Sequence, residues 1–147
     1  MKSHSWLLEN LPHQGSMNLL DTVLSWDADQ IHCSASSHLD PNNPLAENGL
    51  LGTSAGIEYA AQAMAAHGRL TAPATTTPRQ GYIAGIRDIR FYVQTLNNAS
   101  PTINIQATRL MGDDDNVIYQ FTISDQGINL VTGRATVVLD RNKNISL

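Results

Sequence analysis

A carboxylate and an amide stand one helical turn apart in a stretch that is otherwise nearly apolar. The segment 49–68, GLLGTSAGIEYAAQAMAAHG, is rich in alanine, the residue with the highest helix propensity, and it predicts one long helix. Glu58 and Gln62, spaced i and i+4, share a face of that helix. A carboxylate among apolar neighbours is costly unless it is paired or takes part in chemistry. The chemistry that such a group performs is proton transfer near neutral pH.

A second acid–base group must come from elsewhere in the chain, and histidine is the most common choice. Three of the five histidines are in less suitable places: His4 is near the N-terminus, His32 is on the outward face of a predicted strand, and His67 is at the end of the helix. The two that remain are His13, in the segment before the first predicted strand, and His38, which opens the loop 38–48. This loop, HLDPNNPLAEN, is rich in turn-forming residues and leads directly into the helix. The residues leave both histidines open as the base.

The composition describes an ordinary globular chain of 147 residues, which fits a single domain, 1–147. The net charge of −4 argues against nucleic acid as a partner. No apolar run approaches the roughly 20 residues that a membrane span requires, and the N-terminus has no secretory signal. A cytoplasmic protein without membrane contact is therefore expected. Cys33 is the single cysteine, which excludes an internal disulfide. It lies in an alternating apolar pattern, which predicts a position in the core.

Alternating apolar residues predict the elements that surround the helix. A short helix over 5–11 and a two-stranded hairpin come before it, and a meander of strands follows a linker over 70–80. Slipped alternation at Arg87 and Asp88 indicates a bulge. The acidic stretch 113–115 indicates a solvated turn rather than a cation site, because no calcium-loop spacing follows it. The predicted strands cover 20–26, 31–35, 82–93, 103–108, 117–123 and 131–139.

One long helix and one antiparallel sheet make an α+β fold in which the sheet wraps around the helix. Thr53 or Ser54 is expected to cap the start of the helix, and Gly68 is expected to take the left-handed conformation at its end. The helix is too small to cover the whole apolar face of the sheet. A second copy is therefore expected to complete the structure as a twofold dimer.

Three stretches resemble motifs of the 3-hydroxyacyl-[acyl-carrier-protein] dehydratases. They are LPHQGSMNLLDTVLSWD (11–27), GIEYAAQAMAAH (56–67) and YIAGIRDIRF (82–91). The second resembles the helix on which the family carries a catalytic Glu, followed four residues later by Gln. The loop HLDPNNPL (38–45) resembles that of a divergent branch associated with aryl-polyene and other polyketide-like biosynthesis. The resemblance implies a hot-dog fold, in which an antiparallel sheet wraps around one central helix.

The resemblance also implies an activity, the dehydration of a 3-hydroxyacyl thioester to the trans-2-enoyl thioester. Glu58 would be the catalytic carboxylate, with His13 or His38 as the base. The main family carries its catalytic histidine in the loop before the helix. At that position, counted back from Glu58, this sequence has Pro44. Only the carboxylate therefore transfers by position.

Three further residues are candidates for substrate binding. Gln62 would orient Glu58 or a water, with a purely structural role as the alternative. Gly56 would let the acyl chain approach closely, and the backbone N–H groups of 52–56 would hold the thioester carbonyl as charge develops on it. Asn43 would contact the substrate or shape the loop. Burial is expected to raise the pKa of Glu58, against the opposite pull of the helix N-terminus.

The partners implied by the resemblance are an acyl carrier protein and a second hot-dog subunit. The substrate would be carried on phosphopantetheine, without a metal or a redox cofactor, in a site between two subunits. A homodimer is expected, and a heterodimer with another dehydratase is the alternative. Arg87 and Arg90 would meet the phosphate or the acidic carrier protein, or form ion pairs on the strand face. Two other functions stay open, an acyl thioester hydrolase and a catalytically inactive subunit that pairs with an active homologue or binds acyl groups.

Overall fold

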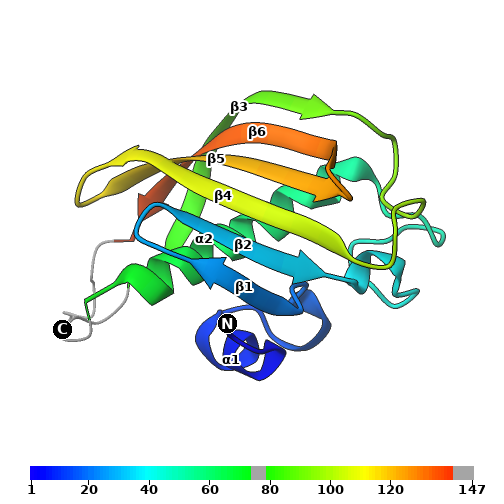
Figure 1. The fold of residues 1–147 in the computed structure, drawn as a ribbon, viewed down its shortest axis with the longest axis horizontal. Coiled ribbons are helices and arrows are strands. Elements are labelled where there is room, and N and C mark those ends of the chain that lie inside the picture. The colour runs from blue at the N-terminus through cyan, green and yellow to red at the C-terminus, as the bar shows by residue number, and fades with distance from the viewer. Residues whose placement is uncertain (74–78, 141–147) are drawn as a thin grey trace.

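The computed structural model describes residues 1–73 and 79–140, in which one long helix lies against a six-stranded antiparallel sheet (Figure 1). The helix, α2 (Gly56–Thr71), crosses behind the sheet and contacts its central strands. In spatial order the strands are β1 (Thr22–Trp26), β2 (Gln30–Ala35), β4 (Ile103–Gly112), β5 (Asn116–Asp125), β6 (Ile128–Leu139) and β3 (Gly81–Phe91). The predicted α+β architecture and its hot-dog arrangement are confirmed.

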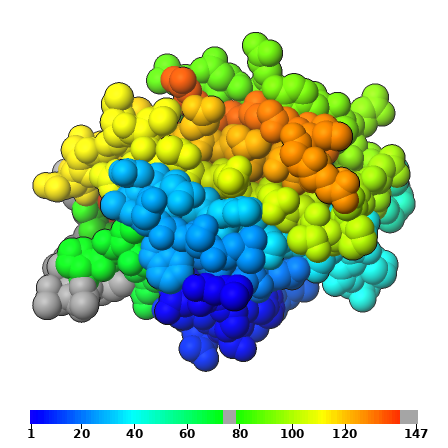
Figure 2. All heavy atoms as spheres, viewed as in Figure 1, coloured from blue at the N-terminus to red at the C-terminus, as the bar shows by residue number. Residues whose placement is uncertain are grey.

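Short elements fill the connections around this sheet. Helix α1 (His4–Asn10) lies beside β1, and the dark-blue N-terminal segment forms the lower margin of the face shown in Figure 2. Single 3-10 turns are η1 (Gly15–Met17), η2 (Ser37–Leu39) and η3 (Thr53–Ala55). The loop 38–48 is otherwise irregular, as predicted. Among the described residues, no helix is both long and apolar enough to cross a membrane.

The alanines of α2 let the sheet approach the helix closely. Ala60, Ala63 and Ala66 are completely buried, and together with Tyr59 and Met64 they form the helix side of the core. The sheet side comes from the inward residues of the central strands, Ile31, Cys33, Ile103, Ile105, Phe121 and Ile123. The predicted core position of Cys33 is thus confirmed, and desolvation raises the pKa of its thiol to about 12.

Both predicted ends of the helix are wrong, for reasons of tertiary structure. The Thr53 hydroxyl donates to the carbonyl oxygens of Val93 and Gln94, which follow β3, instead of capping the helix. The α-helix itself begins only at Gly56. At the other end it passes through Gly68 and stops at Thr71, because Leu70 still packs against the core. Of the predicted linker 70–80, residues 74–78 lie outside the described part of the chain, as does the predicted polar tail from 141 onward.

The predicted bulge in β3 is present. The pairing of β3 with β6 shifts register between Arg87 and Arg90, and Asp88 has a positive φ of 54°. At the acidic turn, the Asp113 carboxylate accepts the backbone N–H groups of Asp115 and Asn116. Within residues 1–73 and 79–140, no three potential metal-ligating side chains gather at any point. The acidic stretch is therefore a hydrogen-bonded turn, as predicted.

Candidate active site

Three polar side chains from two distant parts of the chain meet at the first turns of α2. The His13 Nε2 atom lies 3.0 Å from the Glu58 Oε1 atom, and the Gln62 side-chain amide donates to the same oxygen over 3.2 Å. Glu58 and Gln62 come from the helix, as the i, i+4 spacing predicted. His13 comes from the segment between α1 and β1. Of the two histidines left open by the sequence, the structure brings His13 to the carboxylate.

Gln62 connects these two parts of the chain. Its side chain is completely buried, its Oε1 accepts the Leu19 N–H over 2.9 Å, and its Nε2 donates to the Met17 carbonyl over 2.7 Å. Every polar atom of the amide therefore has a protein partner. A contact with substrate does not fit this burial. The contacts support both an orienting role toward Glu58 and the structural alternative, since the same amide also binds the backbone of Met17 and Leu19.

The segment that carries His13 is fixed on both sides. Asn18 is buried and donates from Nδ2 to the carbonyls of Leu7 (3.1 Å) and His13 (3.4 Å). Leu19, which follows it, is also buried. These contacts hold the backbone of His13 against α1 on one side and against α2, through Gln62, on the other. The imidazole is thereby presented to the helix face that carries Glu58.

The electrostatics of Glu58 differ from the expectation. The pKa of its carboxyl lies below the ordinary value, chiefly because of the hydrogen bond from His13. Desolvation raises it, but the hydrogen bond from Gln62 adds to the lowering. The prediction of a pKa raised by burial is wrong, because the hydrogen bonds outweigh the desolvation of a side chain that is still 32% exposed. Glu58 is a carboxylate at neutral pH.

His38 takes a different position. It is 1% exposed, and its Nε2 donates to the Ser100 carbonyl over 2.8 Å. Within the described residues no hydrogen bond or ion pair joins it to Glu58. The loop turns this ring into the protein, where it donates to a partly buried carbonyl of the β3–β4 connection. The structure therefore gives His38 an anchoring contact and not a place in the cluster.

Asn43 anchors the same loop. It is 5% exposed, and its Nδ2 donates to the Ser37 carbonyl (2.9 Å) and to the Tyr59 hydroxyl (3.2 Å). Its Oδ1 accepts the Leu45 N–H over 2.9 Å. Asn43 therefore ties the loop to the helix residue next to Glu58. Of the two roles that the sequence left open, shaping the loop is the one that these contacts support.

Gly56 serves the contact between helix and sheet. A Cβ atom at this position would lie 3.0 Å from Val131 Cγ2 and 3.4 Å from Ile123 Cγ1. The close approach predicted for an acyl chain is thus occupied by β5 and β6. Backbone N–H groups here are also engaged, since Thr53 donates to the Gln94 carbonyl and Ala55 donates to the Gly52 carbonyl.

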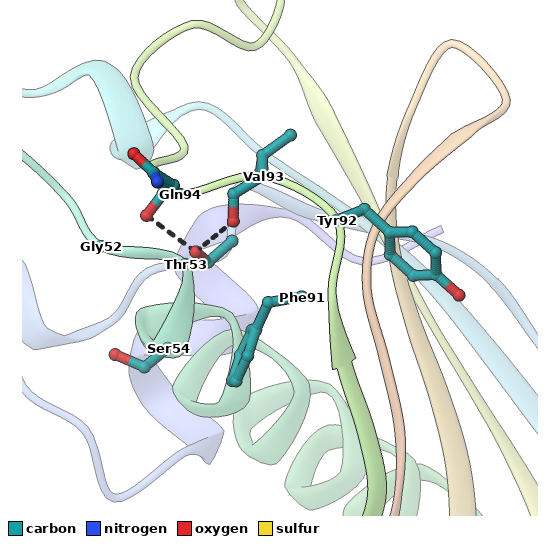
Figure 3. A pocket seen from close by; sticks show the side chains of 7 residues that line it. All are labelled: Gly52, Thr53, Ser54, Phe91, Tyr92, Val93 and Gln94. Carbon is teal, nitrogen blue, oxygen red and sulfur yellow. Dashed lines mark hydrogen bonds between the residues drawn. The ribbon is translucent and has the colours of Figure 1, made fainter.

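A recess of about 510 Å³ opens beside the start of α2. It is lined by Gly52, Thr53, Ser54, Phe91, Tyr92, Val93 and Gln94, and we call it the recess below. In Figure 3 the Phe91 ring points toward the helix, whereas the Tyr92 ring points away from it. Ser54, which belongs to η3, lies four residues before Glu58 in the chain, and Glu58 itself stands in the first turn of α2.

The sequence did not reveal the recess. Phe91 and Val93 alternate as inward residues should, yet 47% and 37% of their surfaces are exposed. The position of Phe91 and Val93 at the end of a predicted strand could have indicated this exposure, because no other predicted element remained to cover them.

We expect Gln62→Leu to destabilise the fold by about 2–4 kcal/mol, because buried backbone groups of Met17 and Leu19 lose their partner at about 1–3 kcal/mol each. The pKa of Glu58 should also rise, because one of its donors is lost. Gln120→Leu, on an exposed position of β5, is the matched control and should change stability by less than about 0.5 kcal/mol. Urea unfolding measures both variants. Equal free energies of unfolding for the two variants would show that the Gln62 contacts do not hold the segment around Met17 and Leu19 in place.

Comparison with known proteins places this geometry in context. A family model described as ApeP-like, ApeP dehydratase, matches residues 7–146. Among solved structures, the dehydratase heterocomplex ApeI:P from Xenorhabdus doucetiae matches with a TM-score of 0.77 and 26% identity, over 94% of this chain and 92% of that one. Comparison with curated protein sequences found no match.

Two thioesterases share the fold at lower identity. A mutant thioesterase from Pseudomonas aeruginosa has a TM-score of 0.68 and 13% identity, over 95% of this chain and 94% of that one. A thioesterase from Haemophilus influenzae has a TM-score of 0.61 and 13% identity, over 82% and 78%. At this identity the likeness concerns the fold alone.

Proposed function

Because the chain belongs to the ApeP-like dehydratase family, we propose that its substrate is a 3-hydroxyacyl thioester carried on an acyl carrier protein. The enzyme is a dehydratase, and the proposed product is the trans-2-enoyl thioester, made in fatty-acid-like or aryl-polyene biosynthesis. Elimination of water moves protons without changing oxidation state, so the proposed reaction requires no redox cofactor, and we propose no metal for it. A substrate on a carrier protein is consistent with a place in the cytoplasm.

The observation that carries this proposal is the partly exposed carboxylate of Glu58, held by His13 and Gln62 in the first turns of α2. Dehydration requires a base for a proton on C2 and an acid for the hydroxyl on C3. Glu58 is ionised at neutral pH, its Oε2 accepts no hydrogen bond from the described residues, and 32% of the side chain is exposed. A substrate can therefore reach this oxygen.

The recess supports a position for the thioester. Its walls combine the apolar surfaces of Phe91 and Val93 with the backbone of Gly52 and Ser54, which lie just before α2. The N-terminus of a helix favours negative charge, such as the enolate oxygen that forms when C2 loses a proton. We therefore place the thioester carbonyl near Gly52 and Ser54, with the next two carbons of the acyl chain directed toward Glu58.

The edge strand β3 supports a second hot-dog subunit as a partner. It forms one edge of the sheet, and four large apolar residues on it or just after it are 37–57% exposed, namely Tyr82, Phe91, Tyr92 and Val93. A long unpaired edge with exposed aromatic residues readily pairs with another chain. The solved ApeI:P heterocomplex makes another dehydratase a reasonable partner for this edge, beside a second copy of this chain.

We expect native mass spectrometry to show the chain as part of a dimer, alone or after co-expression with a second hot-dog dehydratase. Two exposed tyrosines can be compared as sites of substitution. Tyr82 lies within the edge strand, whereas Tyr92 lies beyond its end. Tyr82→Arg should weaken the dimer by introducing a charge into the contact. A chain that stays monomeric both alone and after co-expression with the second dehydratase would refute the proposed dimer.

Arginines near the same edge support an acidic carrier protein. Arg87 lies directly opposite Arg134 across β3 and β6, and Arg90 follows on β3. Within residues 1–73 and 79–140, none of the three forms an ion pair, so the predicted strand-face ion pairs are not formed. Two like charges opposite each other destabilise a sheet, and an acidic partner would relieve that repulsion. Equal turnover of carrier-bound and free pantetheine substrates would contradict this part of the proposal.

We expect the protein to remove water from a carrier-bound 3-hydroxyacyl thioester, detected as the loss of one water by mass spectrometry. Glu58→Gln should lower the rate about 10²–10⁴-fold, because it removes the proton-transferring group while keeping its size. Glu9→Gln, on an exposed position of α1, is the control and should keep the rate. Release of free acid would instead identify a thioester hydrolase. An unchanged substrate, with or without a partner subunit, would identify an inactive subunit.

A further inference from the structure

The His13 ring presents its two nitrogen atoms to different surroundings. Nε2 lies 3.0 Å from Glu58 Oε1, whereas Nδ1 is buried and has no hydrogen-bond partner among the described residues. Only 24% of the side chain is exposed. The surface of the ring that a substrate could reach therefore does not include Nδ1.

These surroundings determine where the His13 proton lies. A neutral ring protonated on Nδ1 would turn the Nε2 lone pair toward a carboxylate oxygen, which repels it. A doubly protonated ring would bury a charged N–H without an acceptor, and this is more costly than burying an unpaired lone pair. The attraction within an ion pair that is partly open to solvent is small and does not compensate. The resting state is a neutral imidazole whose Nε2–H donates to Glu58.

A histidine in this state cannot take a proton from the substrate. Its Nε2 already carries a proton, and its Nδ1 lone pair is buried. His38, the other candidate, is committed to the Ser100 carbonyl. The remaining acid–base atom in the cluster is Glu58 Oε2, because Oε1 already accepts hydrogen bonds from His13 and Gln62.

We propose that Glu58 Oε2 performs both proton transfers of the dehydration and that His13 is a positioning residue, which holds Oε1 through its Nε2–H. The inference rests on the proposed function and assigns the roles within it. It replaces the division of labour between a histidine base and a carboxylate acid that the sequence suggested.

The reaction then runs on one oxygen atom. Oε2 takes a proton from C2, and the electron pair of that C–H bond moves into the enolate of the thioester. The protonated Oε2 next gives the same proton to the C3 hydroxyl as the C3–O bond breaks. Water leaves, the C2–C3 double bond forms, and Glu58 returns to its carboxylate state. Because one atom serves both groups, the C2 proton and the hydroxyl leave from the same face of the chain.

Substrate binding prepares the carboxylate for this task. The hydrogen bond from His13 keeps the pKa of Glu58 low in the free enzyme. An acyl chain that covers Oε2 removes water from it, which favours the protonated form and makes the carboxylate a stronger base. The two donors on Oε1 meanwhile direct the incoming proton to Oε2.

Two substitutions of His13 separate a positioning residue from a base. Glutamine places an N–H close to the position of Nε2 but cannot take up a proton, whereas alanine provides neither. We expect His13→Ala to lower kcat about 10–100-fold and to move the acidic limb of the pH–rate profile upward, since Glu58 loses its main donor. His13→Gln should recover most of the lost rate and most of the shift. A His13→Gln enzyme that folds normally and is as inactive as Glu58→Gln would overturn the proposal.

Two further measurements keep the test independent of the variants, and the second is also independent of the activity. With substrate stereospecifically deuterated at C2, loss of the hydrogen on the hydroxyl's face is expected, and anti elimination would overturn the single-oxygen mechanism. Nitrogen-15 NMR of the wild-type imidazole should show a proton on Nε2 and a bare Nδ1 near neutral pH, and any other state would overturn the positioning role. If the wild-type protein dehydrates nothing, the proposed function fails, while this NMR result still decides the state of His13.

Discussion

Two N–H groups converge on one oxygen of Glu58, and the arrangement of the whole site follows from this contact. His13 and Gln62 both donate to Oε1, so the carboxylate has a fixed orientation and only Oε2 is left for other chemistry. Hydrogen bonds to the ionised form lower the pKa of a carboxyl, and here they outweigh a partial loss of solvent. The carboxylate is charged at rest and can still be reached from solvent. A proton-transfer group needs both properties before its substrate arrives.

The fold supplies the rigidity that this contact requires. The alanine-rich face of α2 lets a six-stranded sheet close around the helix, so the backbone of Glu58 and Gln62 is fixed by the core. Gln62 then uses its remaining hydrogen bonds to hold the segment after His13. Asn43 ties the preceding loop to Tyr59 on the same helix. Groups that are distant in the sequence therefore share one rigid element, and small displacements of the histidine are resisted.

Much of this could be read from the sequence, and the exceptions have physical causes. Alternation predicted the strands and the bulge at Asp88, because a strand with one buried face requires period two. Helical spacing placed Glu58 and Gln62 on one face. The choice between His13 and His38 depended on where two loops fold, which local patterns do not encode. The helix start was misplaced because Thr53 bonds to residues far along the chain.

The most direct test of the account is a crystal structure of the protein, with its partner subunit if one is required, bound to a stable 3-hydroxyacyl pantetheine amide. The account predicts the C3 hydroxyl within about 2.6–3.2 Å of Glu58 Oε2, the reach of direct proton transfer. His13 should still hold Oε1 in that complex, and the carbonyl should lie at the start of α2. A hydroxyl bound to His38 or to His13, with Glu58 out of reach, would contradict the central claim.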